Sequence, residues 1–240
     1  MYAVISDVHS NLEALEAVLR DIKSRGIGEI FFLGDAVGYG PDPDRCVEIL
    51  AEECKILLAG NHDWGVCGLT DVDAFNENAR VAIMLTKTVI GPAHLAALGA
   101  LPVRVDLKER DITLVHATPW EPEKWHYLLH LAEAELNFNN FGTAVCFIGH
   151  SHSPVIIEKR RSGELVSSRT AAEMSAGARC IVNVGSVGQP RDGDPRACYA
   201  LVDGRGVKFV RVSYGLETTQ EKMRRAGFPA FLIERLAFGM

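Results

Sequence analysis

Residues 2–9 read Tyr-Ala-Val-Ile-Ser-Asp-Val-His, an apolar run of strand type that ends in a carboxylate and an imidazole. The same arrangement recurs at two later points. Residues 30–33, Ile-Phe-Phe-Leu, precede Gly34-Asp35, and residues 56–59, Ile-Leu-Leu-Ala, precede Gly60-Asn61-His62-Asp63. Because open α/β sheets gather functional groups at the carboxyl ends of their strands, we expect these polar side chains to meet at one edge of a sheet.

The segments between these runs have helical periodicity. Apolar residues recur at helical spacing between Leu12 and Ile22, with Asn11 placed to cap that helix and Gly26 placed to end it. A second helix is expected near residues 44–53. The order therefore predicts a parallel β-α-β-α-β unit over residues 2–59, followed by helices near residues 74–88 and 92–98.

The second half of the chain is richer in strands. An apolar run at residues 112–115 leads into His116, and another at residues 144–148 leads into Gly149-His150-Ser151-His152. Further strands are expected at residues 103–107, 155–159, 179–184, 197–202 and 207–212, with helices at 217–225 and 229–238. The pattern predicts an α/β fold, a two-sheet β-sandwich flanked by helices. Without a linker or repeat, residues 1–240 are expected to form a single domain.

Composition excludes some classes of function. The formal net charge of -6 argues against a surface that coats nucleic acid. No segment approaches the roughly 18 apolar residues of a membrane span, and we expect no secretory signal because residues 2–6 already read as a strand. Six scattered cysteines without a C-x-x-C pair are expected to be buried, reduced thiols. We therefore expect a cytoplasmic protein, whose oligomeric state the sequence leaves open.

Together the strand-end motifs supply side chains that can bind metals, among them Asp7, His9, Asp35, Asn61, His116, His150 and His152. Two Asp, one Asn and four His suit a pair of divalent transition ions better than one ion. In order, spacing and strand context the motifs resemble the calcineurin-like metallophosphoesterase superfamily, over residues 1 to about 200. The resemblance is to its small bacterial and archaeal phosphodiesterases and its dinucleoside-polyphosphatase-like members.

The resemblance implies a role for each ligand. Asp7, His9 and His152 would hold the first metal, Asn61, His116 and His150 the second, and Asp35 would bridge both. Neutral imidazoles favour Mn, Fe, Co, Ni or Zn over Mg. Of these metals, Mn is favoured for both ions. Taken singly, Asp7 or Asp35 could instead cap a helix or turn, and His116 could be a satisfied core histidine.

The implied chemistry is hydrolysis of a phosphate ester by a hydroxide that bridges the two metals. His62 would protonate the leaving oxygen or help bind the phosphoryl group. Asp63 follows it directly and could orient His62, with a simple turn residue as the alternative.

The motif loops also bear on the substrate. The superfamily's protein phosphatases carry an arginine in the Gly-Asp block and another soon after Asn-His-Glu, but residues 34–43 and 60–66 of this chain contain none. A dianionic monoester favours such a clamp, so a small phosphodiester or dinucleoside-polyphosphate-type substrate is expected. The alternatives are a phosphomonoesterase or protein phosphatase, and a non-catalytic protein-binding scaffold of the same fold.

Two other segments are candidates for binding this small-molecule phosphate ester. Arg191, in a Gly-rich loop after a strand, could replace the missing clamp, or it could be a solvated surface residue. Trp120, with Trp125 and Tyr127, could stack on a base while His126 touches phosphate. The alternative for these aromatic residues is packing of an irregular loop on the core.

Overall fold

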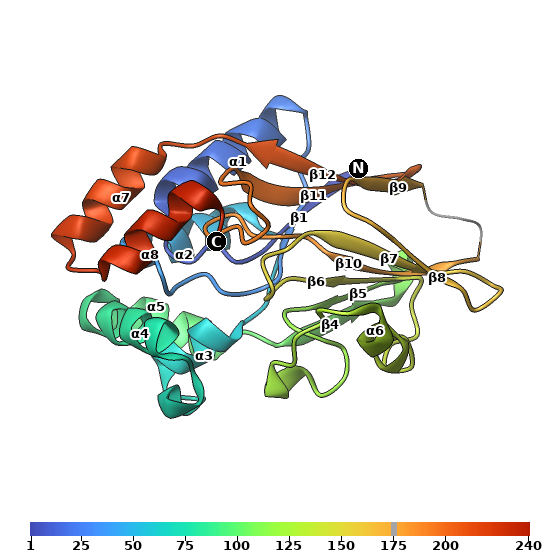
Figure 1. Cartoon of the computed structure of the whole chain (residues 1–240), viewed down its shortest axis with the longest axis horizontal. Helices are drawn as coiled ribbons and strands as arrows, with labels where there is room; N and C mark the ends of the chain where they lie inside the picture. Colours follow the sequence, from blue (N-terminus) through green and yellow to red (C-terminus); the bar gives the residue numbers. More distant parts are fainter. Residues whose placement is uncertain (174–176) are drawn as a thin grey trace.

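The computed structural model describes residues 1–173 and 177–240. They form two six-stranded sheets with helices on the outside (Figure 1). Large apolar side chains from both sheets, among them Phe31, Leu114 and Phe147, share one buried cluster between the layers. This core holds the two sheets in a fixed relation, so that loops from both reach a common site. The predicted α/β sandwich is confirmed.

The first sheet contains the predicted parallel opening. Its strand order is β3-β2-β1-β11-β12-β9, with β1, β2 and β3 parallel and the remaining neighbours antiparallel. The strands are β1 (Tyr2–Ile5), β2 (Ile30–Phe32), β3 (Ile56–Leu57), β9 (Ala171–Glu173), β11 (Ala197–Asp203) and β12 (Gly206–Val212). Strands β11 and β12, both predicted, form an antiparallel hairpin that turns between Asp203 and Gly206.

The second sheet has the order β4-β5-β6-β10-β7-β8, in which β5, β6 and β10 are parallel. Its strands are β4 (Arg104–Leu107), β5 (Ile112–Val115), β6 (Val145–Ile148), β7 (Val155–Lys159), β8 (Leu165–Ser168) and β10 (Arg179–Asn183). Strands β8 and β9 were not predicted. Each lies at the edge of its sheet and is poor in buried apolar residues, so the sequence pattern there is weak.

The helices are α1 (Leu12–Ser24), α2 (Pro43–Glu53), α3 (Asn61–Cys67), α4 (Glu77–Val89), α5 (Pro92–Gly99), α6 (Leu131–Phe138), α7 (Leu216–Arg225) and α8 (Ala230–Glu234). Short 3₁₀ turns cover Val72–Ala74, Lys108–Arg110, Pro122–Lys124 and Arg235–Phe238. The Asn11 side chain accepts a hydrogen bond from the Ala14 N–H at 3.2 Å, as a cap of α1 should. Sequence analysis missed α3 and α6.

The cysteines and the helix lengths bear on two expectations from composition. All six cysteines are free thiols, and five of them are buried. Across the residues that the structure describes, no helix combines the length and the apolar character needed to cross a membrane.

Candidate metal centre

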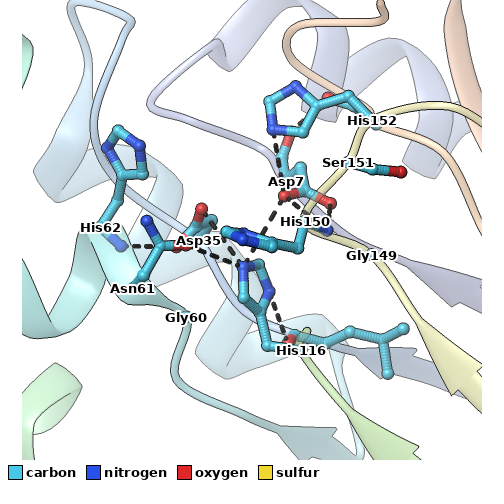
Figure 2. Close-up of polar contacts among 12 residues, drawn as sticks. Asp7, Asp35, Gly60, Asn61, His62, His116, Gly149, His150, Ser151 and His152 are labelled. Carbon is cyan, nitrogen blue, oxygen red and sulfur yellow. Dashed lines mark hydrogen bonds and ion pairs between the residues drawn. The ribbon is translucent and has the colours of Figure 1, made fainter. Parts of the chain in front are cut away.

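The seven predicted ligand residues come together where strands of both sheets end. Figure 2 shows side chains from the loops after β1, β2, β3, β5 and β6 pointing toward a common centre. The exposed fractions of all seven lie between 0 and 7%. Burying so many polar groups is costly unless each has a partner, so their hydrogen bonds indicate what the centre can hold.

Asp7, His9 and His152 form the first ligand group, with donor atoms within 4.8 Å of one another. The Nδ1–H of His9 donates to the Val37 carbonyl at 3.1 Å, and that of His152 donates to the Gln189 carbonyl at 2.6 Å. Both Nε2 atoms of the neutral rings therefore carry lone pairs, yet they face each other at 3.0 Å. Two lone pairs at this distance repel unless they share a cation, so the group fits a metal ion.

His116 is the core of the second group. Its Nδ1–H donates to the Leu33 carbonyl at 3.2 Å, and its Nε2 faces Asp35 Oδ2 at 3.4 Å and Asn61 Oδ1 at 3.3 Å. Burial alone would lower the pKa of His116, but the carboxylates of Asp35 and Asp7 outweigh it and raise this pKa to about 9. A proton on Nε2 thus takes the place that a cation would take among these oxygens.

His150 contributes its other ring nitrogen to the same group. Its Nε2–H donates to the Trp125 carbonyl at 3.0 Å, which leaves the Nδ1 lone pair for a metal. Burial lowers the pKa of His150 to about 3, so the ring is neutral. With Asp35 and His116 it forms a second set of donor atoms within 4.8 Å.

Asp35 lies between the two groups. Its Oδ2 is 3.6 Å from Nε2 of His9 and 3.4 Å from Nε2 of His116, while its Oδ1 accepts the His62 backbone N–H at 2.8 Å. Burial opposes ionisation of Asp35, but His116 and the neighbouring imidazoles hold its pKa well below the usual range. The position fits a carboxylate shared by two ions.

The backbone at the ligands is not extended. Five of them have left-handed φ angles: Asp7 (55°), His9 (49°), Asp35 (59°), His150 (66°) and His152 (57°). Non-glycine residues adopt this region uncommonly, at a cost of about 1–3 kcal/mol each. The pairs Asp7-x-His9 and His150-x-His152 therefore converge through left-handed backbone and not as extended segments.

Two glycines allow the loops to pack this closely. A Cβ at Gly60 would lie 2.1 Å from Asp35 Oδ1, and a Cβ at Gly149 would lie 2.5 Å from Asp7 Oδ2. Any larger residue would displace a carboxylate of the centre.

The sequence profile of the calcineurin-like phosphoesterase superfamily domain matches residues 1–206. The chain belongs to this superfamily. It is 42% identical to a metallophosphoesterase from Sphaerobacter thermophilus, whose crystal structure matches with a TM-score of 0.86 over 100% of this chain and 98% of that one. An uncharacterised protein of Methanocaldococcus jannaschii is 41% identical over 243 residues, covering 100% of this chain and 98% of the relative.

A hypothetical protein from Pyrococcus horikoshii has the same fold, with a TM-score of 0.80 at 21% identity over 100% of this chain and 98% of the other. Membership of a metal-dependent family agrees with the ligand chemistry of the centre. The chain is a metal-binding phosphoester hydrolase.

His62 of this phosphoesterase lies beside the ligands without a hydrogen bond to its buried Nδ1 among the described residues (Figure 2). Its ring packs between Tyr39 and Phe75, at centroid distances of 4.6 and 5.5 Å. Burial lowers the pKa of His62 to about 4, and the charge of Arg191 acts in the same direction while Asp35 opposes it. The ring is held in place, and its Nδ1 lies buried beside Gly38.

Asp63 does not orient His62, contrary to the expectation from their adjacency. Its Oδ2 accepts the backbone N–H groups of Asp35 and Gly60, both at 2.9 Å, and its Oδ1 accepts that of Val37 at 3.2 Å. Neighbouring side chains diverge on a helix, and both residues lie in α3. Asp63 is therefore a positioning residue for the loop that carries Asp35. Burial and the charge of Asp35 raise its pKa to about 7.

Trp120 and His126 lie outside the cavity that adjoins the centre. Their rings stack on each other at 4.3 Å and 12°, and His126 Nε2 contacts Glu121 Oε2 at 3.2 Å. Their placement does not support the predicted contacts with substrate. Trp125 and Tyr127, from the same segment, do line the cavity.

Arg191 lies near the centre. Its guanidinium is 5.5 Å from the Tyr39 ring centre and donates to Gln189 Oε1 at 2.7 Å through Nη2. Within the described parts of the chain, no carboxylate lies within ion-pair distance of it. Arg235, which sequence analysis missed, is close enough for the two charges to interact: burial and Arg191 lower the pKa of Arg235 to about 10.

Two further residues position the ligand loops and were also missed. Asn183 Nδ2 donates to the Gly149 carbonyl at 2.6 Å, and the Ser186 hydroxyl donates to the Asp7 carbonyl at 2.8 Å. Both follow or end β10, so the same strand-end signal that pointed to the ligands applied to them.

Proposed function

We propose that this phosphoesterase is a binuclear hydrolase of a small phosphodiester or dinucleoside-polyphosphate-type substrate. One observation carries the proposal: Asp35 Oδ2 is within 3.6 Å of a ring nitrogen from each of the two ligand groups. A shared carboxylate offsets the repulsion between two neighbouring cations.

The five buried free thiols also support a cytoplasmic location, because reducing compartments preserve thiols.

Each ligand then has a place. The first ion would be held by Asp7, His9 and His152, the second by Asn61, His116 and His150, and both by Asp35. Two such ions, with Mn favoured among Mn, Fe, Co, Ni and Zn, supply an activated water and neutralise the phosphate oxygens.

The protein's own groups complete the site. Asn61 offers a neutral amide oxygen, so it adds no charge that would repel an anionic phosphate. His62 lines the cavity beside the centre, where it would contact the phosphoryl group or the leaving oxygen. Asp63 holds the backbone on either side of Asp35 through three accepted hydrogen bonds. The buried ligands exclude bulk water and strengthen these interactions.

The loops that carry Asp35 and His62 supply no arginine, which favours a substrate with one charge at the scissile phosphate. Arg191 favours the second candidate, a phosphomonoesterase, because it could bind a further phosphate oxygen. It fits the first candidate as well, since a polyphosphate chain has a second phosphate for a nearby cation.

The test compares matched aryl esters. Protein stripped with a chelator and reloaded with Mn is assayed on bis(p-nitrophenyl) phosphate and p-nitrophenyl phosphate, with bound metal counted by mass spectrometry. We expect two ions per chain and a higher kcat/KM for the diester. A preference for the monoester would instead support the phosphomonoesterase, and full metal loading without hydrolysis of either ester would support a scaffold.

A further inference from the structure

A cavity of about 260 Å³ opens directly beside the metal centre. Three residues of the centre, Asn61, His62 and His150, form one part of its lining. A molecule bound by its phosphate at the centre would therefore have its next chemical group in this cavity. The volume lies just below the roughly 300 Å³ at which small-molecule sites begin, which suits a single ring system.

The rest of the cavity is largely aromatic. Tyr39 and Phe75 flank His62, while Trp125 and Tyr127 come from the segment after β5. The Tyr127 ring lies flat on the His150 ring, at 4.0 Å and 20°, and the residue is 48% exposed at the mouth. Trp125 packs edge-on against Trp64 at 5.1 Å. Ring faces are thus held in place by the centre's own residues.

Polar groups also line this aromatic cavity. Asn76 Oδ1 accepts the Ala79 N–H at 3.0 Å as the cap of α4, which leaves its amide N–H groups free to donate. Lys124 adds an exposed ammonium. Ring faces with a few hydrogen-bonding groups match a flat heteroaromatic ring better than an acyl chain, which offers no π-face and no acceptors.

We propose that the aromatic cavity binds a nucleobase-type planar ring attached to the scissile phosphate. This rests on the proposed function, because it places the phosphate at the metal centre. Tyr127 and Phe75 are the specificity-determining side chains, and Asn76 contacts the ring edge. The cavity narrows the proposed substrate, a small phosphodiester or a dinucleoside polyphosphate, to an ester of a nucleoside.

Binding without turnover tests the cavity. Isothermal titration of the Mn-loaded protein compares AMP with ribose 5-phosphate, which lacks the base. Stacking on one or two rings should make AMP bind roughly 10-fold more tightly. Tyr127→Leu should remove most of this difference, whereas Tyr127→Phe, which keeps the ring, should retain it. Trp120→Leu is the matched control: its ring lies on the same segment but outside the cavity, so the difference should stay.

Metal content is measured for every variant. If Tyr127→Leu loses Mn through its contact with His150, the same comparison of AMP with ribose 5-phosphate is made on Phe75→Leu, whose ring lines the cavity next to His62. Equal affinity for AMP and ribose 5-phosphate in the wild type would overturn the inference, as would equal effects of Tyr127→Leu and Trp120→Leu. Base-dependent AMP binding without ester hydrolysis would support the base site and reject the proposed function. Ester hydrolysis without a preference for the base would support the proposed function and reject the base site.

Discussion

The metal centre and the aromatic cavity share Asn61, His62 and His150 but are held by different forces. In the centre, the rings of His9, His116 and His152 are each aimed by an N–H that donates to a backbone carbonyl. In the cavity, Tyr127 is placed by stacking on His150. Hydrogen bonds are directional, whereas ring stacking tolerates sliding and tilting. Substitutions in the centre should therefore abolish most metal binding or activity, whereas substitutions in the cavity should lower ligand affinity gradually.

The largest effect is expected from Asp35→Asn. Removing the shared negative charge should lower metal affinity by roughly 100-fold or more and abolish most diester hydrolysis. Metal analysis after gel filtration, together with kcat/KM, measures both. Asp73→Asn, an exposed carboxylate near the cavity, is the control and should keep two ions. Two ions and full activity in Asp35→Asn would rule out the centre described here.

His62→Ala lies at the boundary between the two regions. We expect it to keep both ions, because His62 is outside the proposed ligand set, and to lose roughly 10²–10⁴-fold in kcat. The loss should shrink for a nitrophenolate leaving group if His62 donates a proton. An equal loss for good and poor leaving groups would assign His62 to phosphoryl binding.

Metal uptake should depend on pH through His116, whose pKa in the metal-free protein is raised to about 9. Below that pH the ring carries a proton that a metal must displace, so apparent affinity should rise about tenfold per pH unit up to about pH 9 and then level off. His150, with a pKa lowered to about 3, adds nothing to this slope near neutrality. Calorimetry at pH 7.5 in buffers of different ionisation enthalpy should show about one proton released; none released would contradict the assignment.

The smallest effect is expected from Arg191→Ala. Arg191 lies near the centre, against the Tyr39 ring of the cavity. Turnover of a dinucleoside polyphosphate should fall several-fold, roughly as for one lost charge-assisted hydrogen bond, while a simple aryl diester should change less. The ratio of the two kcat/KM values is the measurement. A uniform decrease for both substrates would mean that Arg191 acts through Tyr39 or Gln189 instead of a second phosphate.

The centre and the cavity also differ in how well the sequence predicts them. Each candidate ligand follows a strand end and belongs to a residue type with metal chemistry, so the meeting of Asp7, Asp35 and His116 at one edge could be expected from the sequence. Helix α3 was missed because its residues, including Gly65, are weak helix formers. The left-handed backbone at His9 or His152 depends on loop packing, and no local residue pattern specifies it.

The cavity was predicted only in part: Trp125 and Tyr127 were expected to stack on a base, but nothing in the sequence pointed to Tyr39 and Phe75. Tyr39 stands between two glycines in the loop after Asp35. Phe75 precedes α4 and is distant along the chain from every candidate ligand. Trp120 and Trp125 are equivalent by residue type. Left-handed residues at Glu121 and Trp125 turn the segment, so that one ring lines the cavity and the other stacks outside it.

The ligands come from both sheets, and this has a mechanical consequence. Asp7 follows a strand of the first sheet and His150 one of the second, and they are 143 residues apart along the chain. Ions bound by such residues would cross-link the two layers and close a loop longer than half the chain. Such an ion would bind only when both sheets are in place. It would therefore stabilise the folded state, and separating the sheets would require the ion to dissociate first.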